Sequence, residues 1–259
     1  MIDTIKSIKK SIEHWKVWTY FGWLDIKLKY RTAVIGPFWI TASLTVFCLA
    51  LTNVYSAIFH IEMSGMLLYI AVGLSSWTLI IGPISESPTL LINNSGYIKE
   101  AGINPIEVIF RCVFRNIIIY LHNFIFILML IFFGYGGIDT VILLLPLNIF
   151  LVLINITFIS LILSIIGARY RDVGQIVQNI TQLLFLITPV FWVINEQALK
   201  SPLVYLNPFY YYLELLRSPL LSIMPSMEAY IVSSVSTLIL LFIFSYLYSK
   251  KKNEINYWI

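Results

Sequence analysis

The chain has 259 residues, of which 59% are apolar and only 12% are charged, with a formal net charge of +4. Its mean hydropathy is +0.86. Soluble domains carry about a quarter charged residues, so this composition excludes a soluble protein and indicates an integral membrane protein.

The first segment, residues 1–33, is predicted to be a cytoplasmic amphipathic interface segment. Ile5, Ile8, Ile12 and Trp15 recur at helical spacing with lysines on the other side, which favours a helix lying on the membrane surface. A solvated basic leader helix is the alternative. A Gly36-Pro37 break then joins this segment to the first membrane span at an angle.

Residues 34–259 are predicted to form one permease domain of the all-α integral membrane class. A transmembrane helix needs about 20 apolar residues, and six such spans are expected, at residues 34–59, 66–92, 105–133, 140–167, 175–194 and 228–249. The connection at 195–227 is long, apolar and punctuated by prolines. It predicts re-entrant helices before the last span, because irregular backbone at membrane depth must be covered by protein or face a cavity. An amphipathic surface segment is the alternative there.

The basic residues predict the orientation of these spans. All 17 lysines and arginines except Lys200 and Arg217 lie in residues 1–33, 93–116, 168–174 or the last ten residues. With six spans these four regions share one side, so the positive-inside rule predicts that both termini are cytoplasmic.

No phosphate-binding loop, catalytic motif or metal-binding pattern occurs in the sequence, so no catalytic or metal site is expected. Polar residues within the spans carry more information. Gln175, Gln178, Asn179 and Gln182 form one stripe on the fifth span, and Thr41 and Thr45 belong to a weaker stripe on the first. They predict either a solvated pathway or hydrogen bonds between helices. Glu86 is an intramembrane acid for which three roles stay open: a pathway residue, a partner of a basic group, or a protonated carboxyl.

Aromatic side chains near these stripes suit the faces of sugar rings, although packing is the commoner role of any one of them. The residues expected to line a channel are Trp39, Thr41, Thr45, Trp77, Gln178, Gln182, Phe185 and Trp192.

Two basic connections look structured. Residues 93–105 are expected to form a short helix capped by Asn94 or Ser95 and ended near Gly102. Residues 167–173 place two arginines, a tyrosine and an aspartate in one tight turn. Ordinary positive-inside loops are the alternative for both.

Five stretches together resemble the permease of polysaccharide-exporting ABC transporters, which export O-antigen, capsule and teichoic acid. They are KYRTAVIGPFW at 29–39, the NNSGYIK stretch followed by Pro105, GARYRDV at 167–173, TPVFW at 188–192 and NPFYYYLELLRSPLL at 207–221. The resemblance runs in order from about residue 10 to the end.

The resemblance implies a role for each region. Residues 11–32, with Lys29, Tyr30 and Arg31 near their end, would form the interface helix, and Tyr97, Ile98, Lys99 and Glu100 would belong to the coupling helix on an ATPase subunit. Arg169, Tyr170, Arg171 and Asp172 would begin a gate helix that meets the pyrophosphate of an undecaprenyl-linked glycan. Residues 195–227 would close the outer side.

The resemblance also implies an inner-membrane homodimer with two ATP-binding subunits. ATP and magnesium would bind those subunits, and this chain would have no cofactor, no catalytic activity and no nucleic-acid partner. The alternatives are an exporter of teichoic acid, a drug or a lipid with the same architecture, and a channel that works without an ATPase.

Overall fold

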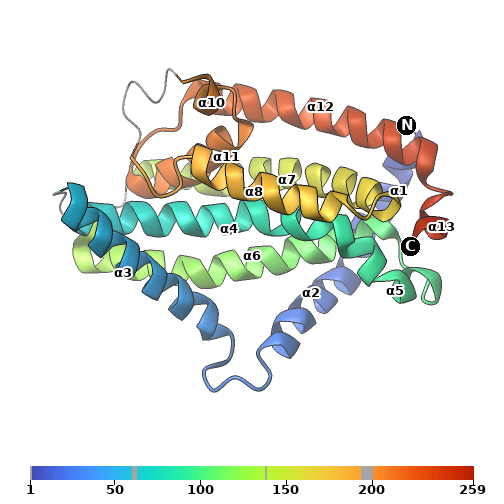
Figure 1. The fold of residues 1–259 in the computed structure, drawn as a ribbon, viewed down its shortest axis with the longest axis horizontal. Helices are drawn as coiled ribbons and strands as arrows, with labels where there is room; N and C mark the ends of the chain where they lie inside the picture. The colour runs from blue at the N-terminus through green and yellow to red at the C-terminus, as the bar shows by residue number, and fades with distance from the viewer. Residues whose placement is uncertain (1, 60–62, 138, 194–200) are drawn as a thin grey trace.

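The computed structural model describes residues 2–59, 63–137, 139–193 and 201–259, which are all-helical (Figure 1). The long helices are α3 (Trp39–Phe59), α4 (Met63–Asn93), α6 (Pro105–Leu130), α7 (Leu145–Arg169) and α12 (Met227–Lys251). The shorter α-helices are α1 (Ile2–Glu13), α2 (Trp15–Lys29), α5 (Ser95–Lys99), α8 (Val173–Ile187), α10 (Pro202–Tyr205), α11 (Pro208–Arg217) and α13 (Ile255–Trp258). Four short elements of other helix types are η1 (Gly36–Phe38), η2 (Ile131–Tyr135), η3 (Thr140–Leu144) and η4 (Ser218–Leu221).

Five helical segments in the described ranges are long and apolar enough to cross a membrane: Gly36–Ile58, Gly65–Asn93, Pro105–Tyr135, Thr140–Arg169 and Met227–Lys251. They match the first, second, third, fourth and sixth predicted spans to within a few residues. The prediction of an all-α integral membrane protein is therefore confirmed.

The fifth predicted span, residues 175–194, is shorter than expected. Helix α8 has 15 residues and ends at Ile187, so it is about 22 Å long beside a hydrocarbon core of about 30 Å. Pro189 ends it, because the residue before a proline is pushed out of the helical region, and Thr188 is indeed extended. Residue 194 lies outside the described residues.

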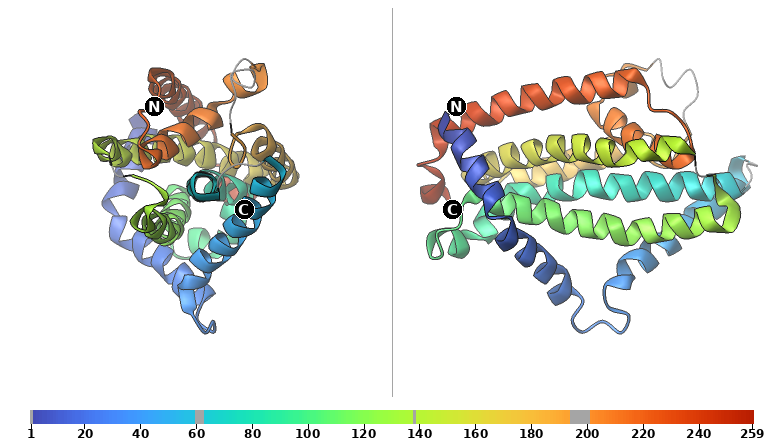
Figure 2. Two further views of the ribbon diagram at one scale, coloured as in Figure 1. Left: turned by 90° about the vertical axis from the view of Figure 1, so that its left-hand side faces the viewer. Right: turned by 180° about the vertical axis from the view of Figure 1, so that it is seen from behind.

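The core is built around α4, which packs against α3, α6, α7, α8 and α11. Figure 2 shows α4, α6, α7 and α12 running nearly parallel, with α3 crossing them obliquely. Tyr212 and Leu213 of α11 are almost fully buried, and α11 contacts α4, α7 and α12. In the segment before the last span, α11 is therefore packed into the bundle, whereas α10 packs on α11 and leaves Leu203 and Tyr205 exposed. Residues 195–200 of the predicted re-entrant segment lie outside the described ranges.

The interface segment is two helices rather than the one predicted for residues 11–32. The break falls at His14, between α1 and α2. There the Trp18 Nε1 donates to the carbonyl of Ser11 at 2.9 Å, and His14 Nδ1 lies 3.0 Å from Glu107 Oε1 of α6. A side chain that takes a backbone hydrogen bond from the helix in this way produces a kink. The sequence has no proline or glycine at this position that would have predicted the break.

Helix α1 leaves its apolar stripe uncovered. Its buried face is small and polar, with Thr4 bonded to Ser249 of α12 at 2.8 Å. Ile8 is partly buried against the core, whereas Ile5 and Ile12 of α1, and Trp15 at the start of α2, are each more than half exposed. A stripe of this kind beside lysines fits a membrane surface. Its position on a membrane stays a prediction.

Asn155 joins three helices inside the bundle. Its Nδ2 donates to the Ser233 carbonyl at 3.1 Å and to Thr237 Oγ1 at 2.9 Å, and its Oδ1 accepts from Tyr212 Oη at 3.1 Å.

We expect Asn155→Leu to lower the free energy of unfolding by about 1–2 kcal/mol, since the buried polar groups that bond to Asn155 would lose this partner. The unfolding midpoint in detergent measures this. Asn53→Leu is the control because Asn53 is exposed on α3, and equal midpoints for the two variants would contradict the prediction.

Candidate functional site

Both termini, α1, α5, α13 and the turn at residues 169–172 lie at one end of the bundle (Figure 1); this is called the terminal end below. Contacts join these parts: Lys99 Nζ donates to the Ile259 backbone oxygen at 2.5 Å, and Arg169 Nη1 lies 3.7 Å from Glu254 Oε2. Parts of all four basic regions therefore meet at this end, although the first region also extends away from it along α2.

The buried side chain of Ile98 anchors helix α5 to this end. Ile98 is 6% exposed and packs in a core with Ile106 and Ile109 of α6, whereas Tyr97, Lys99 and Glu100 are exposed. The four predicted coupling residues thus divide into one anchor and three surface groups. That surface is available to a partner protein; the coupling role itself stays a prediction.

The side-chain cap predicted for α5 does not form. Asn94 occupies the N-cap position, but its side chain makes no capping bond, and Ser95 is the first residue of the helix. Asn94 Nδ2 instead donates to the Leu90 carbonyl at 2.8 Å, and its Oδ1 accepts from Arg111 Nη1 at 3.5 Å. The nearby arginine competes for the oxygen that would have capped the helix. Helix α5 ends at Lys99, before Gly102, as expected.

A charged cluster, defined by Asp25, Glu86, Arg111 and Arg115, joins α2, α4 and α6. Arg111 forms a two-pronged bond with Asp25, with Nε–Oδ2 at 2.8 Å and Nη2–Oδ1 at 2.5 Å. Arg115 Nη1 lies 3.6 Å from Asp25 Oδ2, and Arg115 also pairs with Glu86. Two arginines and two carboxylates balance each other, which is how partly buried charges are stabilised.

Arg111 extends the cluster to α5. Its guanidinium carbon lies 5.4 Å from the ring centre of Phe21 on α2 and 5.6 Å from that of Tyr97 on α5. Both distances fall within the range of cation–π attraction. One side chain of α6 thereby touches the interface helix through Asp25 and Phe21, and the predicted coupling helix through Tyr97.

The structure thus places Glu86 as a partner of a basic group, one of the three roles left open for it. The arginine cluster itself was not predicted as a site. The available signal was Arg111 and Arg115 at helical i, i+4 spacing in an otherwise apolar span, since charges in such spans usually have partners.

The turn at 169–172 holds its two arginines differently. Arg169 packs over the rings of Tyr170 and Trp258, at 5.3 and 5.2 Å, and pairs with Glu254. Arg171 is exposed, and within the described ranges it forms no salt bridge. Asp172 is exposed at the N-cap position of α8, where its side chain makes no capping bond. Arg171 is therefore the arginine with a side chain available to an anion.

The amide stripe of α8, made up of Gln175, Gln178, Asn179 and Gln182, is exposed along its whole length. Gln175 donates to Asn179 at 3.2 Å, and Gln178 donates to the Ser85 carbonyl at 3.3 Å. A row of amides is costly against lipid. The stripe therefore needs water, substrate or another protein surface in front of it.

The other predicted lining residues are dispersed. Thr41 donates to the His122 carbonyl of α6 at 2.8 Å, and Thr45 donates to the Thr41 carbonyl at 2.8 Å. Trp39 is half exposed on α3, and Trp192 donates to the Leu186 carbonyl at 3.2 Å. Trp77 is 5% exposed and packs against Phe185 and Phe209 at 5.9 and 6.4 Å. A shared channel lining stays a prediction, and in this chain Trp77 belongs to the core.

Lys29, Tyr30 and Arg31 lie apart from the terminal end. Lys29 is the last residue of α2, and Tyr30 and Arg31 follow it where α2 and α3 form a V (Figures 1 and 2). Lys29 Nζ lies 5.7 Å from the Tyr30 ring centre, and burial raises the pKa of the Tyr30 phenol above its ordinary value. The structure therefore does not bring these three residues next to the turn at 169–172.

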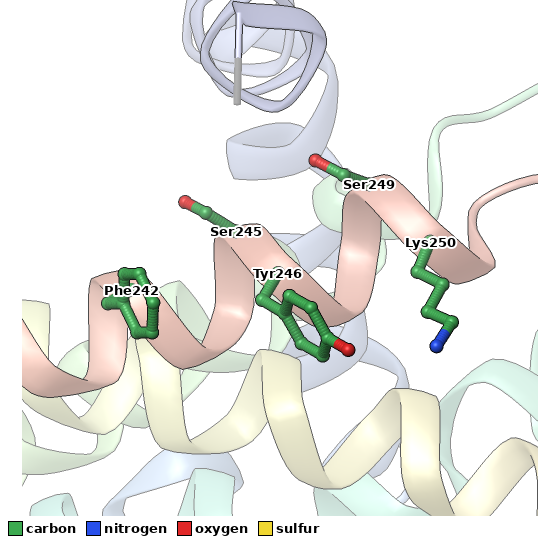
Figure 3. A pocket seen from close by; sticks show the side chains of 5 residues that line it. All are labelled: Phe242, Ser245, Tyr246, Ser249 and Lys250. Carbon is green, nitrogen blue, oxygen red and sulfur yellow. The ribbon is translucent and has the colours of Figure 1, made fainter.

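A hollow of about 480 Å³ lies along α12 and was not predicted from the sequence. Figure 3 shows its lining residues, with Tyr246 and Lys250 pointing to one side of the helix and Ser249 to the other. Lys250 Nζ lies 5.7 Å from the Tyr246 ring centre. Aromatic residues and lysines of this kind are typical of a helix end at a membrane interface.

Comparison with known proteins gives one family. The family model for ABC-2 type transporters matches residues 17–221, which include most of α2, the charged cluster, α5, the turn at 169–172, α8 and α11. No curated protein was found to match the chain.

Proposed function

Because the chain belongs to the ABC-2 type transporter family of membrane proteins, we propose that it exports a lipid-linked polysaccharide. The family consists of transport subunits that associate with ATP-binding subunits. The proposed cargo is a glycan on undecaprenyl pyrophosphate, such as O-antigen. The proposed assembly is a homodimer with two ATPase subunits in the bacterial inner membrane, with the terminal end in the cytoplasm.

The amide stripe of α8 carries the proposal of a polar cargo. Its exposed amides begin one turn after Arg171, whose guanidinium has no salt-bridge partner in the described part of the chain. Arginine forks match phosphate oxygens, and amides suit sugar hydroxyls. A phosphate at Arg171 and sugars along α8 would therefore meet complementary groups in order.

The ATPase contact is proposed to be the outer surface of α5. Tyr97, Lys99 and Glu100 are exposed there, and Arg111 links Tyr97 to α2. Movement imposed on α5 would therefore reach α2 and α6. Purification of the chain with a stably bound ATPase would support this arrangement, and transport by an ATPase-free form would contradict it.

We expect Arg171→Ala to weaken binding of an undecaprenyl-pyrophosphate oligosaccharide about tenfold, which corresponds to about 1.4 kcal/mol. The unfolding midpoint should not change, because the side chain is exposed. The affinity of Arg171→Lys should lie between those of the unaltered protein and Arg171→Ala, since lysine keeps the positive charge but lacks the forked guanidinium. Binding of a fluorescent oligosaccharide lipid to the purified transporter measures the effect.

Lys27→Ala is the matched control, since it removes an exposed positive charge from α2. It should bind like the unaltered protein. Unchanged binding by Arg171→Ala, or unaltered export by a well-inserted Arg169→Ala/Arg171→Ala variant, would contradict the phosphate role. Transport of a drug or a glycan-free lipid in preference to the oligosaccharide lipid would favour the alternative exporters.

A further inference from the structure

The segment after α8 is a strap across the inside of the bundle, defined here as residues 188–192. It begins where Pro189 ends the helix, and Thr188, Pro189 and Val190 are all buried. Irregular backbone at this depth must find hydrogen-bond partners other than its own helix. The partners of the strap are therefore informative.

Side chains from α4 and α11 supply these partners. Arg217 Nη1 donates to the Pro189 carbonyl at 2.6 Å, Asn207 Nδ2 donates to Thr188 Oγ1 at 2.8 Å, and Tyr69 Oη donates to the Trp192 carbonyl at 3.1 Å. At Gly73 of α4 the strap approaches so closely that a Cβ would overlap the Val190 carbonyl. The strap is thus bound along its length to two elements.

Arg217 is the unusual member of this set. It is 6% exposed, and within the described ranges it forms no salt bridge. Its guanidinium carbon lies 4.4 Å from the Tyr69 ring centre, while Glu214, one turn earlier, accepts a bond from the Ser226 amide at 2.8 Å. Its charge is balanced by the Pro189 carbonyl, the Tyr69 side chain and the nearby Glu214 carboxylate, without a salt bridge in the described ranges, and burying an arginine in this way is costly. An apolar side chain would pack here at less cost in free energy, so we look for a role of the arginine in holding the strap in position.

The strap lies toward the end of the bundle opposite the terminal end, beside α10 and α11 (Figure 1). A polar path along α8 that opens at this end requires the strap to separate from α4 or α11. We propose that Arg217 is a positioning residue that holds the strap closed and releases it during transport. This inference rests on the proposed function, since it assumes a path along α8.

The test uses the transporter with its ATPase in proteoliposomes loaded with a small fluorescent dye. Arg217→Met removes the group that donates to the Pro189 carbonyl. Because this hydrogen bond from a charged group exists only in the closed state, its loss should favour the open state, and we expect the dye to leak roughly tenfold faster without ATP. Basal ATP hydrolysis should stay unchanged, and Arg217→Lys should partly restore the seal. Lys27→Met, an exposed cation on α2, is the control. Unchanged leak per folded Arg217→Met complex would overturn the proposal.

A cross-link tests the same idea if Arg217→Met does not fold. Thr188→Cys and Asn207→Cys replace two side chains in hydrogen-bond contact, and the natural Cys48 and Cys112 are buried and free. Oxidation should stop export of the oligosaccharide lipid and reduction should restore it. If the cross-linked protein exports the oligosaccharide lipid as fast as the protein whose disulfide has been reduced, the proposal is overturned.

The two proposals fail in different ways. If the unaltered complex exports the oligosaccharide lipid while neither the Arg217→Met variant nor the cross-link changes leak or export, the strap proposal fails alone. If the unaltered complex does not move that lipid but Arg217→Met still leaks, the cargo proposal fails and the role of Arg217 stands.

Discussion

Replacing Arg111 by alanine should lower the free energy of unfolding by roughly 3 kcal/mol and uncouple ATP hydrolysis from transport. The loss of stability follows because Asp25, whose side chain is 18% exposed, would lose its two-pronged partner, and breaking a buried ion pair costs about 3–5 kcal/mol. The lower end applies here because both side chains keep some water contact and Arg115 remains near Asp25. Denaturant unfolding in detergent measures the stability.

The uncoupling has a separate cause. Arg111 touches Phe21 of α2 and Tyr97 of α5 as well as Asp25, so its loss separates α5 from the interface helix. ATP hydrolysis by the complex should persist while stimulation by substrate disappears. A merely structural role would reduce both in proportion to the amount of folded protein.

A double-mutant cycle with Asp25→Asn and Arg111→Gln isolates the pair. Each single change should destabilise the protein, and the double change should cost less than the two summed, since neither charge is then left alone. Additive effects would show that the pair contributes nothing. Lys16→Ala is a suitable surface control because Lys16 is exposed on α2.

Gly167→Ala should destabilise the protein by roughly 3 kcal/mol, a large effect for one methyl group. Helix α7 crosses α4 there so closely that a Cβ would overlap backbone atoms of Pro88. Overpacking costs about 1–3 kcal/mol where side chains can yield, and backbone yields less. Because Gly167 lies two residues before Arg169, the displaced helix should also weaken the Arg169–Glu254 contact. The denaturant midpoint measures the first effect.

Gly174→Ala is the matched control on the other side of the same turn. A Cβ there would lie 3.5 Å from Thr89 Cγ2, an ordinary contact. It should therefore leave stability unchanged or raise it by up to about 1 kcal/mol, since alanine favours the helix. A Gly167→Ala variant as stable as Gly174→Ala would show that α4 and α7 separate without cost.

The sequence predicted most of the fold because hydropathy and length are local properties. Apolar runs located the five long spans to within a few residues, and the Gly36-Pro37 break and the basic connections were placed correctly. The fifth span was overextended although Pro189 was visible, because apolarity continues past the point where the helix ends. The break at His14 could not be predicted, since it depends on side-chain contacts: Glu107 of α6 pairs with His14, and Trp18 donates to the Ser11 carbonyl.

The candidate site was predicted less well, because residue type indicates a role but not a partner. Arg169 and Arg171 looked equivalent in the sequence, yet α13 engages only Arg169. Trp77 and Gln178 were expected to share a lining. Trp77 is in the core and Gln178 is exposed, and their shared lining stays a prediction. Arg217 was counted only as one of two cations outside the basic regions.

By itself, the sequence determined that this is a helical membrane protein, and it predicted that the basic segments share one side. Burial of apolar surface and the cost of charge in lipid depend on composition and spacing, and both can be read along the chain. Only the tertiary structure decided which charges meet. Asp25, Glu86, Arg111 and Arg115 come from three helices, and Arg217 meets a carbonyl 28 residues away. Such pairs depend on helix packing, which no local pattern specifies.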